Sequence, residues 1–276
     1  MPLALVLSSF VAASRIGGGA QQYVLAAHRI DPVLAPTSLF GRSPAKGAVG
    51  EPTPPDVFRR MLGDIEADAV FGMVDLVITG HFSLPEQVRI AAGVLERVRA
   101  TAPRQPVVIV DPIMGDAPYG RYVQPGVAEE VMQRLVPLAD WITPNLWELE
   151  QMVGRPLTSA AETAAACREL GRKALVTSPP LADDRAGLLF CAADRACLFT
   201  HARRDKAPKG TGDFVAASFG AGLVEGMSPA HAAERTACAI TDVIEAAAEM
   251  GAGELPVVAM ADRVVRPCAG VTIELL

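Results

Sequence analysis

The sequence has 276 residues, of which 50% are hydrophobic, 20% are charged and 5% are aromatic, and its formal net charge is −6. This composition excludes intrinsic disorder, which needs low hydrophobicity and a high net charge, and the length is enough for one large α/β domain with an extensive core. A net negative charge without a stripe of Lys and Arg argues against nucleic-acid binding. No apolar run reaches the roughly 18 residues of a membrane span, so neither a nucleic acid nor a membrane is an expected partner.

The N-terminus and the cysteines bear on the cellular compartment. Residues 1–7 lack the basic region of a signal peptide and instead resemble a first core strand. The cysteines are scattered and form no C-x-x-C pair, as expected for buried thiols in a reducing compartment. They are Cys167, Cys191, Cys197, Cys238 and Cys268. We therefore expect a cytoplasmic protein.

Short apolar runs alternate with amphipathic segments along most of the chain. The apolar runs that predict buried parallel strands are residues 4–7, 75–79, 107–110, 141–143 and 174–177. The segments with helical spacing between them are residues 85–100, 127–136 and 159–170. This alternation predicts an α/β fold in which a mostly parallel central sheet lies between two helix layers, a three-layer α/β/α sandwich.

Two regions interrupt the alternation. Residues 37–55 are rich in Pro and Gly and poor in apolar residues, which predicts a long loop or flap. Residues 187–191 and 196–200 are apolar runs around a short polar stretch, which predicts an antiparallel hairpin at the edge of the sheet. Because no internal repeat or linker is visible, we expect a single domain over residues 1–276.

The first motif with chemical potential is Lys209-Gly210-Thr211-Gly212-Asp213, which leads into a small-residue helix over residues 214–223. Glycines on both sides of Thr211 let the backbone turn tightly, and the N-terminus of a helix attracts phosphate oxygens. Asp213 in the first helical turn can accept a proton from a hydroxyl group. The structural alternative is that Asp213 only caps the helix.

Two further motifs directly follow predicted strands, where ligands bind in open α/β sheets. Asp111 and Asp116 come after the strand over residues 107–110, and such carboxylates suit Mg²⁺, although Asp-Pro and Gly-Asp also favour a simple turn. Asn145 and Glu148 come after the strand over residues 141–143 and are expected to point into the same crevice. Their structural alternative is a capped helix start.

Other common sites are disfavoured. The sequence has no P-loop, and the G-x-G-x-x-G/A pattern that begins at Gly17 fails at Gln22, so a Rossmann dinucleotide site is not supported. The histidines are isolated, without metal-ligand spacing: His28, His81, His201 and His231. An NAD-dependent oxidoreductase is therefore a remote alternative that rests on the α/β pattern alone.

Taken together and in this order, the motifs G-T-G-D near residue 213, D-P-x-M-G-D near residue 111 and T-P-N-x-x-E near residue 145 resemble the ribokinase-like kinases. Within that group the pyridoxal kinases are the nearest match. The resemblance spans nearly the whole chain and includes the strand end at residues 7–9 and residues 77–80. It implies a ribokinase-like fold, ATP and Mg²⁺ as cofactors, in many members also K⁺, and a homodimer.

The resemblance also implies roles for individual residues. Asp213 matches the base that faces the substrate's hydroxymethyl group, and Gly210, Thr211 and Gly212 match the anion hole for the transferred phosphoryl group. Asp116 and Glu148 match the acids that hold Mg²⁺, largely through water. The residues expected at ATP are Asp111, Asn145, Thr177, Ser178, Lys209 and Thr211. Beside the turn, local positive charge comes from Arg203, Arg204, Lys206 and Lys209, for which a solvated loop is the alternative interpretation.

The substrate side departs from the pyridoxal kinase pattern. Val11 stands where the family typically has a Ser that touches the pyridine ring, and a valine cannot make that hydrogen bond. His81 replaces an aromatic residue, and the flap motif F-S-N-H-T reads Phe40-Gly41-Arg42-Ser43-Pro44. The residues expected to line the substrate are Ser9, Val11, Gly19, Phe40, His81 and Asp213.

The sequence thus predicts an ATP-dependent kinase that phosphorylates the hydroxymethyl group of pyridoxal or a related form of vitamin B6. The altered flap keeps open a kinase for another small alcohol, such as hydroxymethylpyrimidine. A non-catalytic vitamin-binding relative is a second alternative, against which the intact Asp213 and acid pair argue.

Overall fold

The computed structural model describes residues 1–44, 47–204 and 208–276. In these residues one large sheet is formed by β1 (Leu3–Val11), β2 (Asp31–Phe40), β3 (Glu51–Pro52), β4 (Leu76–Thr79), β5 (Val107–Val110), β8 (Trp141–Ile142), β9 (Ala174–Thr177), β10 (Arg185–Cys191), β11 (Ala196–Ala202) and β12 (Thr272–Leu275). Its strand order is β12-β11-β10-β9-β8-β5-β4-β1-β2-β3. A small antiparallel ribbon pairs β6 (Gly115–Asp116) with β7 (Gly120–Arg121).

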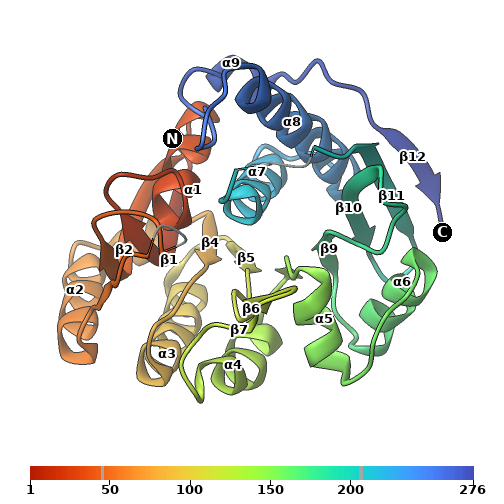
Figure 1. Cartoon of the computed structure of the whole chain (residues 1–276). Helices are drawn as coiled ribbons and strands as arrows, with labels where there is room; N and C mark the ends of the chain where they lie inside the picture. The colour runs from red at the N-terminus through yellow and green to blue at the C-terminus, as the bar shows by residue number, and fades with distance from the viewer. Residues whose placement is uncertain (45–46, 205–207) are drawn as a thin grey trace.

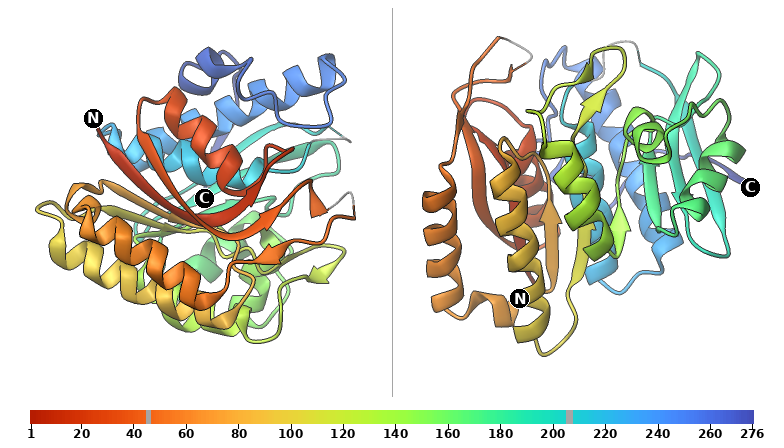
Figure 2. Two further views of the ribbon diagram at one scale, coloured as in Figure 1. Left: turned by 90° about the vertical axis from the view of Figure 1, so that its left-hand side faces the viewer. Right: turned by 90° about the horizontal axis from the view of Figure 1, so that it is seen from below.

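Helices cover both faces of the sheet (Figures 1 and 2). On one face lie α1 (Gly17–Ala27), α7 (Thr211–Val224), α8 (Pro229–Glu249) and α9 (Ala261–Val265). On the other lie α2 (Pro55–Ala67), α3 (Pro85–Thr101), α4 (Val127–Glu130), α5 (Leu146–Val153) and α6 (Ala160–Glu169). The predicted three-layer sandwich is therefore confirmed.

Two hydrophobic cores, one on each face, follow from the alternation of side chains along the strands. In β1, Leu5 and Leu7 belong to the core under α2 and α3, whereas Ala4 and Val6 belong to the core under α1 and α7. All four side chains are fully buried. A run that is apolar at every position, as residues 4–7 are, is what a strand in a parallel sheet covered on both faces requires.

The segment over residues 37–55 is less irregular than expected. Residues 37–40 belong to β2, and residues 51–52 form β3, which pairs antiparallel with β2. The sequence does not predict β2, because the strand contains Pro32 and Pro36, which are typical of loops. Both lie where β2 pairs with β1 and has no partner on its other side among the described residues, so their missing N–H groups cost no ladder bond there.

Two other expectations need correction. The predicted hairpin is confirmed as β10 and β11, but it does not form the edge of the sheet, because β12 pairs antiparallel with β11. The helix predicted over residues 127–136 is α-helical only in α4 and continues as a π-helical turn over Val131–Leu135 and a 3₁₀ turn over Val136–Leu138. Pro137 has no N–H to donate, so a regular helix cannot continue through it. No helix of the described residues is long and apolar enough to cross a membrane.

Candidate active site

The motifs that follow the strands come together at the carboxyl edge of the parallel sheet. Asp111 follows β5, Thr143 follows β8, and Thr177 ends β9, whose backbone forms a parallel bridge with Asn145. The hydroxyl groups of Ser8 and Thr79 are buried at this edge without a hydrogen-bond partner among the described residues, and the Thr143 hydroxyl faces the Asp111 carboxylate. Unpartnered buried hydroxyls are uncommon in folded proteins and mark this edge as a place for a ligand or ion.

The turn before α7 has the geometry of an anion site. Gly210 precedes the helix with a φ of +98°, and a Cβ there would lie 2.5 Å from the Arg15 carbonyl oxygen, so only glycine fits. No described side chain caps the first N–H groups of α7. These N–H groups are thus free to bind phosphate oxygens.

Gly212 does not shape the turn as its position beside Thr211 suggested. It lies inside α7, where its φ is not in the left-handed region, so it does not help to form the turn. A Cβ at Gly212 would lie 4.0 Å from Asp111 Oδ2, which shows how closely the start of α7 approaches that carboxylate. Of the two glycines that flank Thr211, Gly210 is the one that requires glycine for backbone reasons.

Asp213 is held at the start of α7 by the neighbouring helix. Its Oδ2 accepts a hydrogen bond of 2.8 Å from the Gly17 N–H, whereas Oδ1 is buried without a partner among the described residues. Gly17 has a φ of +60° and lies against Ser9. Burial raises the pKa of Asp213 to about 6, although the Gly17 N–H acts in the opposite direction. A carboxylate that is ionised at neutral pH and has a free oxygen can accept a proton from a bound alcohol.

Four carboxylates converge on this edge. Although 53% of Tyr122 is exposed, desolvation of its hydroxyl raises the pKa, and four nearby carboxylates raise it further: Glu148, Asp111, Asp213 and Asp116. Burial, together with the charges of Glu148 and Asp213, also raises the pKa of Asp111 well above its ordinary value. Mutual repulsion of this kind favours a bound cation. Tyr122 has no distinctive sequence signal, because only the fold brings it to the acids.

Glu148 forms a capping box with Asn145. The Asn145 side chain accepts from the Glu148 N–H at 2.9 Å, and Glu148 Oε2 accepts from the Asn145 N–H at 2.9 Å. Glu148 Oε1 accepts from the Met114 N–H at 2.7 Å, and Asn145 Nδ2 donates to the Gly115 carbonyl at 2.8 Å. Burial raises the pKa of Glu148 to about 7, although the hydrogen bonds from these N–H groups act to lower it. The structural interpretation of this motif, a capped helix start, is therefore confirmed, and the same two residues also hold the loop before Asp116.

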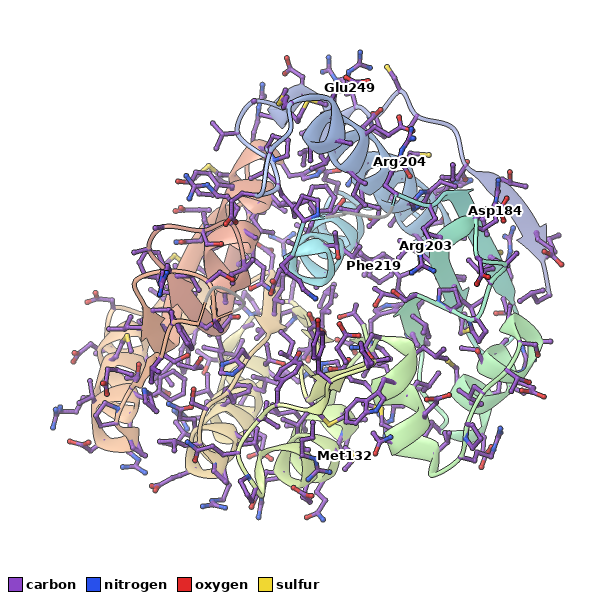
Figure 3. All side chains as sticks on the ribbon, viewed as in Figure 1. Met132, Asp184, Arg203, Arg204, Phe219 and Glu249 are labelled. Atoms are coloured by element: carbon purple, nitrogen blue, oxygen red, sulfur yellow. The ribbon has the colours of Figure 1, made fainter. Side chains whose placement is uncertain are left out.

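Asp116 is the most open of the four acids, with 46% of its side chain exposed, and its Oδ2 lies 3.9 Å from Lys209 Nζ. Ser178, directly after β9, has a φ of +53°, an uncommon conformation for a serine. Of the remaining basic residues, Arg203 and Arg204 follow β11 (Figure 3), and Arg204 pairs with Glu245 at 3.4 Å. Lys206 lies outside the described residues.

On the substrate side, Phe40 and His81 lie together although they are 41 positions apart in the sequence. Their rings meet edge to face with centroids 6.4 Å apart. Burial lowers the pKa of His81 to about 4, so its imidazole is neutral at pH 7. Val11 pairs with Phe40 in the β1–β2 register and is buried, and Gly19 on α1 approaches the Val11 carbonyl. Most of the expected substrate residues are thus neighbours.

A contact from the C-terminal part of the chain holds the β1–α1 loop. Glu254 Oε2 accepts from Ser14 Oγ at 2.6 Å and from the Arg15 N–H at 3.1 Å. The Arg15 carbonyl faces Gly210, and Gly17 two residues later donates to Asp213. The local sequence around Glu254 carries no signal of this role, because the partners of Glu254 lie about 240 residues away.

We expect Glu254→Ala to lower kcat about tenfold, the effect of about 1.4 kcal/mol, because the loop that orients Asp213 loses two charge-assisted hydrogen bonds. Weakening the Gly17 N–H bond removes an interaction that favours ionised Asp213, so the acid limb of the kcat profile should move to higher pH. Steady-state kinetics between pH 5 and 8 measure both effects. The exposed Glu249 at the end of α8 (Figure 3) supplies the control variant Glu249→Ala. An acid limb that stays in place would show that the loop does not depend on Glu254.

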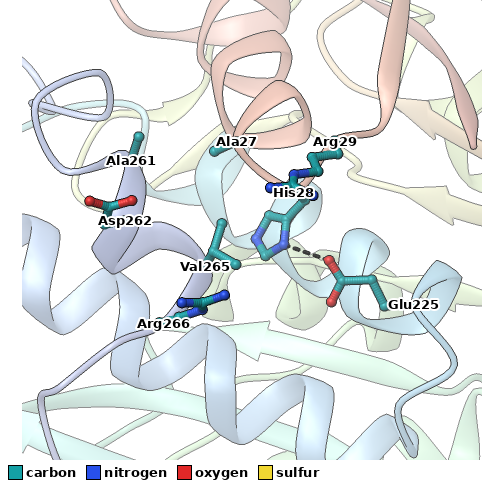
Figure 4. Close-up of a pocket in the computed structure, with 8 residues that line it drawn as sticks. All are labelled: Ala27, His28, Arg29, Glu225, Ala261, Asp262, Val265 and Arg266. Carbon is teal, nitrogen blue, oxygen red and sulfur yellow. Dashed lines mark hydrogen bonds and ion pairs between the residues drawn. The ribbon is translucent and has the colours of Figure 1, made fainter. Parts of the chain in front are cut away.

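A separate pocket of about 440 Å³ lies away from this edge (Figure 4). It is lined by residues at the ends of α1 and α7 and by α9, among them His28, whose Nδ1 pairs with Glu225 at 2.8 Å. The predicted site is at the opposite, N-terminal ends of α1 and α7. The pocket is therefore not part of the candidate active site.

Comparison with known proteins defines the class. A family model described as "Phosphomethylpyrimidine kinase" matches residues 24–258. A pyridoxine/pyridoxal/pyridoxamine kinase of Bordetella avium is 34% identical over 236 residues, which cover 83% of this chain and 79% of that protein. Pyridoxal kinase PdxY of Paraburkholderia phymatum is 32% identical over 223 residues, 75% of this chain and 76% of that protein.

Solved structures confirm the fold. Pyridoxal kinase from Entamoeba histolytica superposes with a TM-score of 0.91 at 20% identity and covers 100% of both chains. Pyridoxal kinase from Leishmania donovani, in complex with ADP and pyridoxamine, gives 0.91 at 21% identity, again over 100% of both chains.

The family model and these relatives place the chain among the phosphotransferases that act on an alcohol group. Within that class, the chain belongs to the pyridoxal kinase family. The predicted family, fold and kinase activity are thereby confirmed.

Proposed function

We propose that the protein transfers the γ-phosphoryl group of ATP to the hydroxymethyl group of pyridoxal or a related form of vitamin B6. The observation that carries this proposal is the junction of α1 and α7. There a carboxylate with a free oxygen, Asp213, directly follows an uncapped helix start whose turn admits only glycine. Phosphoryl transfer depends on positioning and on charge stabilisation, and this junction offers both.

In this proposal the N–H groups at the start of α7 hold the transferred phosphoryl group, while Asp213 orients the alcohol and takes its proton. Its raised pKa of about 6 leaves Asp213 ionised at neutral pH. This pKa is also close to the operating pH, as is favourable for a general base. Asn145, Thr177, Ser178 and Lys209 lie along the same edge and are proposed to contact ATP. A nucleotide ligand is supported by the Leishmania donovani pyridoxal kinase, whose structure is a complex with ADP and pyridoxamine.

Mg²⁺ fits the acids at this edge. Among the described residues no group of three or more His, Cys, Asp or Glu side chains is placed to hold a metal ion. Mg²⁺, however, usually takes one or two carboxylates and completes its shell with water and phosphates. The half-exposed Asp116 can serve as such a ligand, with Glu148 acting through water because its oxygens already accept N–H bonds. When bound, the ion neutralises charge on the phosphates of ATP.

We expect Asp116→Asn to raise the Mg²⁺ concentration needed for half-maximal activity by about tenfold, because one anionic ligand is lost. Activity titrated against Mg²⁺ at saturating ATP measures this shift, and excess chelator should abolish turnover of the wild type. Glu129→Gln, which removes a carboxylate paired with Arg121 outside the cluster, is the control. An unchanged Mg²⁺ requirement in Asp116→Asn would remove Asp116 from the metal site.

The identity of the alcohol depends on Val11, Phe40 and His81. The phenyl ring of Phe40 and the neutral imidazole of His81 are proposed to contact the flat heteroaromatic ring of the substrate. A kinase for hydroxymethylpyrimidine is the second candidate, favoured by the description of the family model that covers residues 24–258. Turnover of pyridoxal, pyridoxine, pyridoxamine and hydroxymethylpyrimidine at equal concentrations tests the proposal. Activity on the pyrimidine alone would replace pyridoxal as the substrate, and absence of turnover on all four would favour a non-catalytic relative.

Three further properties are proposed from the family resemblance: a homodimer, a stimulating monovalent cation such as K⁺, and a cytoplasmic location. The unpartnered hydroxyl of Thr79 and the Thr143 hydroxyl at the Asp111 carboxylate support a cation at this edge. The cysteines are all free, as expected in a reducing compartment. Light scattering and activity in K⁺ against Na⁺ test the first two properties.

A further inference from the structure

A buried glutamine at the start of α3 is connected to both ends of the segment that carries Phe40. Gln87 is fully buried. Its Nε2 donates to the Thr37 and Thr53 carbonyls, at 2.7 Å in each case. Its Oε1 accepts from the Ser83 and Leu84 N–H groups at 3.0 and 3.1 Å. The amide therefore uses both of its donors and both acceptor sites within the protein.

The partners of Gln87 lie next to the proposed substrate residues. Thr37 precedes Phe40 by three residues in β2, and its hydroxyl donates to the His81 carbonyl at 2.5 Å. Ser38 Oγ lies 3.5 Å from His81 Nδ1. A single side chain thus links the strand that carries Phe40 with the loop that runs from His81 to α3.

Thr53 closes the arrangement from the other side. Its N–H donates to the Thr37 carbonyl at 2.9 Å, and its hydroxyl donates to the Pro36 carbonyl at 2.8 Å. Residues 37 and 53 are consequently fixed to each other by direct bonds and by Gln87. A buried amide whose donors and acceptors are all used fixes the relative position of the segments that it joins, which an apolar side chain cannot do.

We propose that Gln87 is a positioning residue for the alcohol substrate, which sets Phe40 and His81 in their mutual geometry without touching the substrate. The inference rests on the proposed function, because it assumes that these two rings contact the acceptor. It does not involve ATP, since the phosphate turn and the acid cluster have no contact with Gln87 among the bonds described.

The test is Gln87→Met, which keeps the length of the side chain and removes all four hydrogen bonds. We expect the KM for the B6 substrate to rise about tenfold. The KM for ATP should stay within about twofold of the wild-type value, and kcat within about threefold. Thr53→Val, which removes only the hydroxyl bond to Pro36, should change KM in the same direction by a smaller factor and keeps the test valid if Gln87→Met folds poorly. Leu95→Ala on the same helix, fully buried but distant from Thr37 and Thr53, is the control for lost stability.

Two outcomes would overturn the proposal: an equal rise in KM for both substrates, or the same KM pattern in Leu95→Ala. Hydrogen exchange separates it from the proposed function. The Thr53 amide should exchange faster in Gln87→Met than in Leu95→Ala whether or not the protein acts on vitamin B6. If that amide stays protected, the positioning role fails even for an active kinase, whereas faster exchange in a protein inactive on every B6 form would contradict only the proposed substrate.

Discussion

Asp213→Asn is expected to reduce kcat for B6 phosphorylation by about 10²- to 10⁴-fold, while ATP binding is unchanged. Asparagine keeps an oxygen that can accept the Gly17 N–H bond but cannot take a proton from the alcohol. Single-turnover phosphoryl transfer and calorimetric titration with ATP measure the two quantities. Equal rates in wild type and variant would show that Asp213 is not the base.

The same substitution should stabilise the fold at neutral pH. The pKa of Asp213 rises on folding from 3.8 to about 6. Ionising this carboxyl therefore costs more in the folded protein than in the unfolded chain. This cost is absent at a pH below 3.8, grows as the pH rises to 6, and is at most about 3 kcal/mol at pH 7. Asparagine does not ionise, so thermal unfolding at pH 7 to 8 should occur at a higher temperature in Asp213→Asn than in wild type. A more stable but inactive variant excludes misfolding as the cause of lost activity.

Wild-type activity should follow the ionisation of Asp213. Kcat is expected to fall as the pH drops through about 6, because the protonated carboxyl cannot act as a base. The acid limb should be absent from the residual activity of Asp213→Asn. An acid limb that persists unchanged in the variant would assign it to another group, of which Glu148, with a pKa raised to about 7, is the nearest candidate.

Gly210→Ala is expected to lower kcat by about 10²- to 10³-fold, the range seen when one donor to a developing anion is lost. The new Cβ would lie 2.5 Å from the Arg15 carbonyl oxygen, and the alanine would have to adopt a φ of +98°. The turn and the first N–H groups of α7 must therefore move. The same shift disturbs the segment that leads from Arg15 to Gly17 and hence the orientation of Asp213. Steady-state kinetics and the affinity for an ATP analogue measure the effect.

Gly226→Ala provides a matched control near the other end of α7. Gly226 has a φ of +83°, and a Cβ there meets no atom within 4 Å. Both variants therefore carry a backbone strain of about 1–2 kcal/mol. Gly226→Ala differs from Gly210→Ala in that its Cβ meets no other atom and it lies away from the phosphate turn. If Gly226→Ala lost as much activity as Gly210→Ala, general destabilisation would explain both.

Much of the fold was predictable because the central strands are buried on both faces. Such strands are continuous apolar runs, and β1, β4, β5 and β9 were found where those runs lie. In contrast, β2 was missed, since Pro32 and Pro36 suggest a loop unless the neighbouring strands are known. The C-terminal strand β12 was missed as well, because all of its residues are exposed and it is held as a strand by its pairing with β11.

The sequence by itself determined the family and the order of the motifs along the chain, because short-range requirements leave local signals. Gly210 is needed for a left-handed turn, and Asn145 with Glu148 forms a capping box within four residues. Only the tertiary structure decided which groups share a site. The Gly17 N–H on Asp213, Glu254 on the β1–α1 loop, and Gln87 between Thr37 and Thr53 all join residues from distant parts of the chain. The pKa values of the acids depend on burial and on neighbours that the fold supplies, so they too could not be read from the sequence.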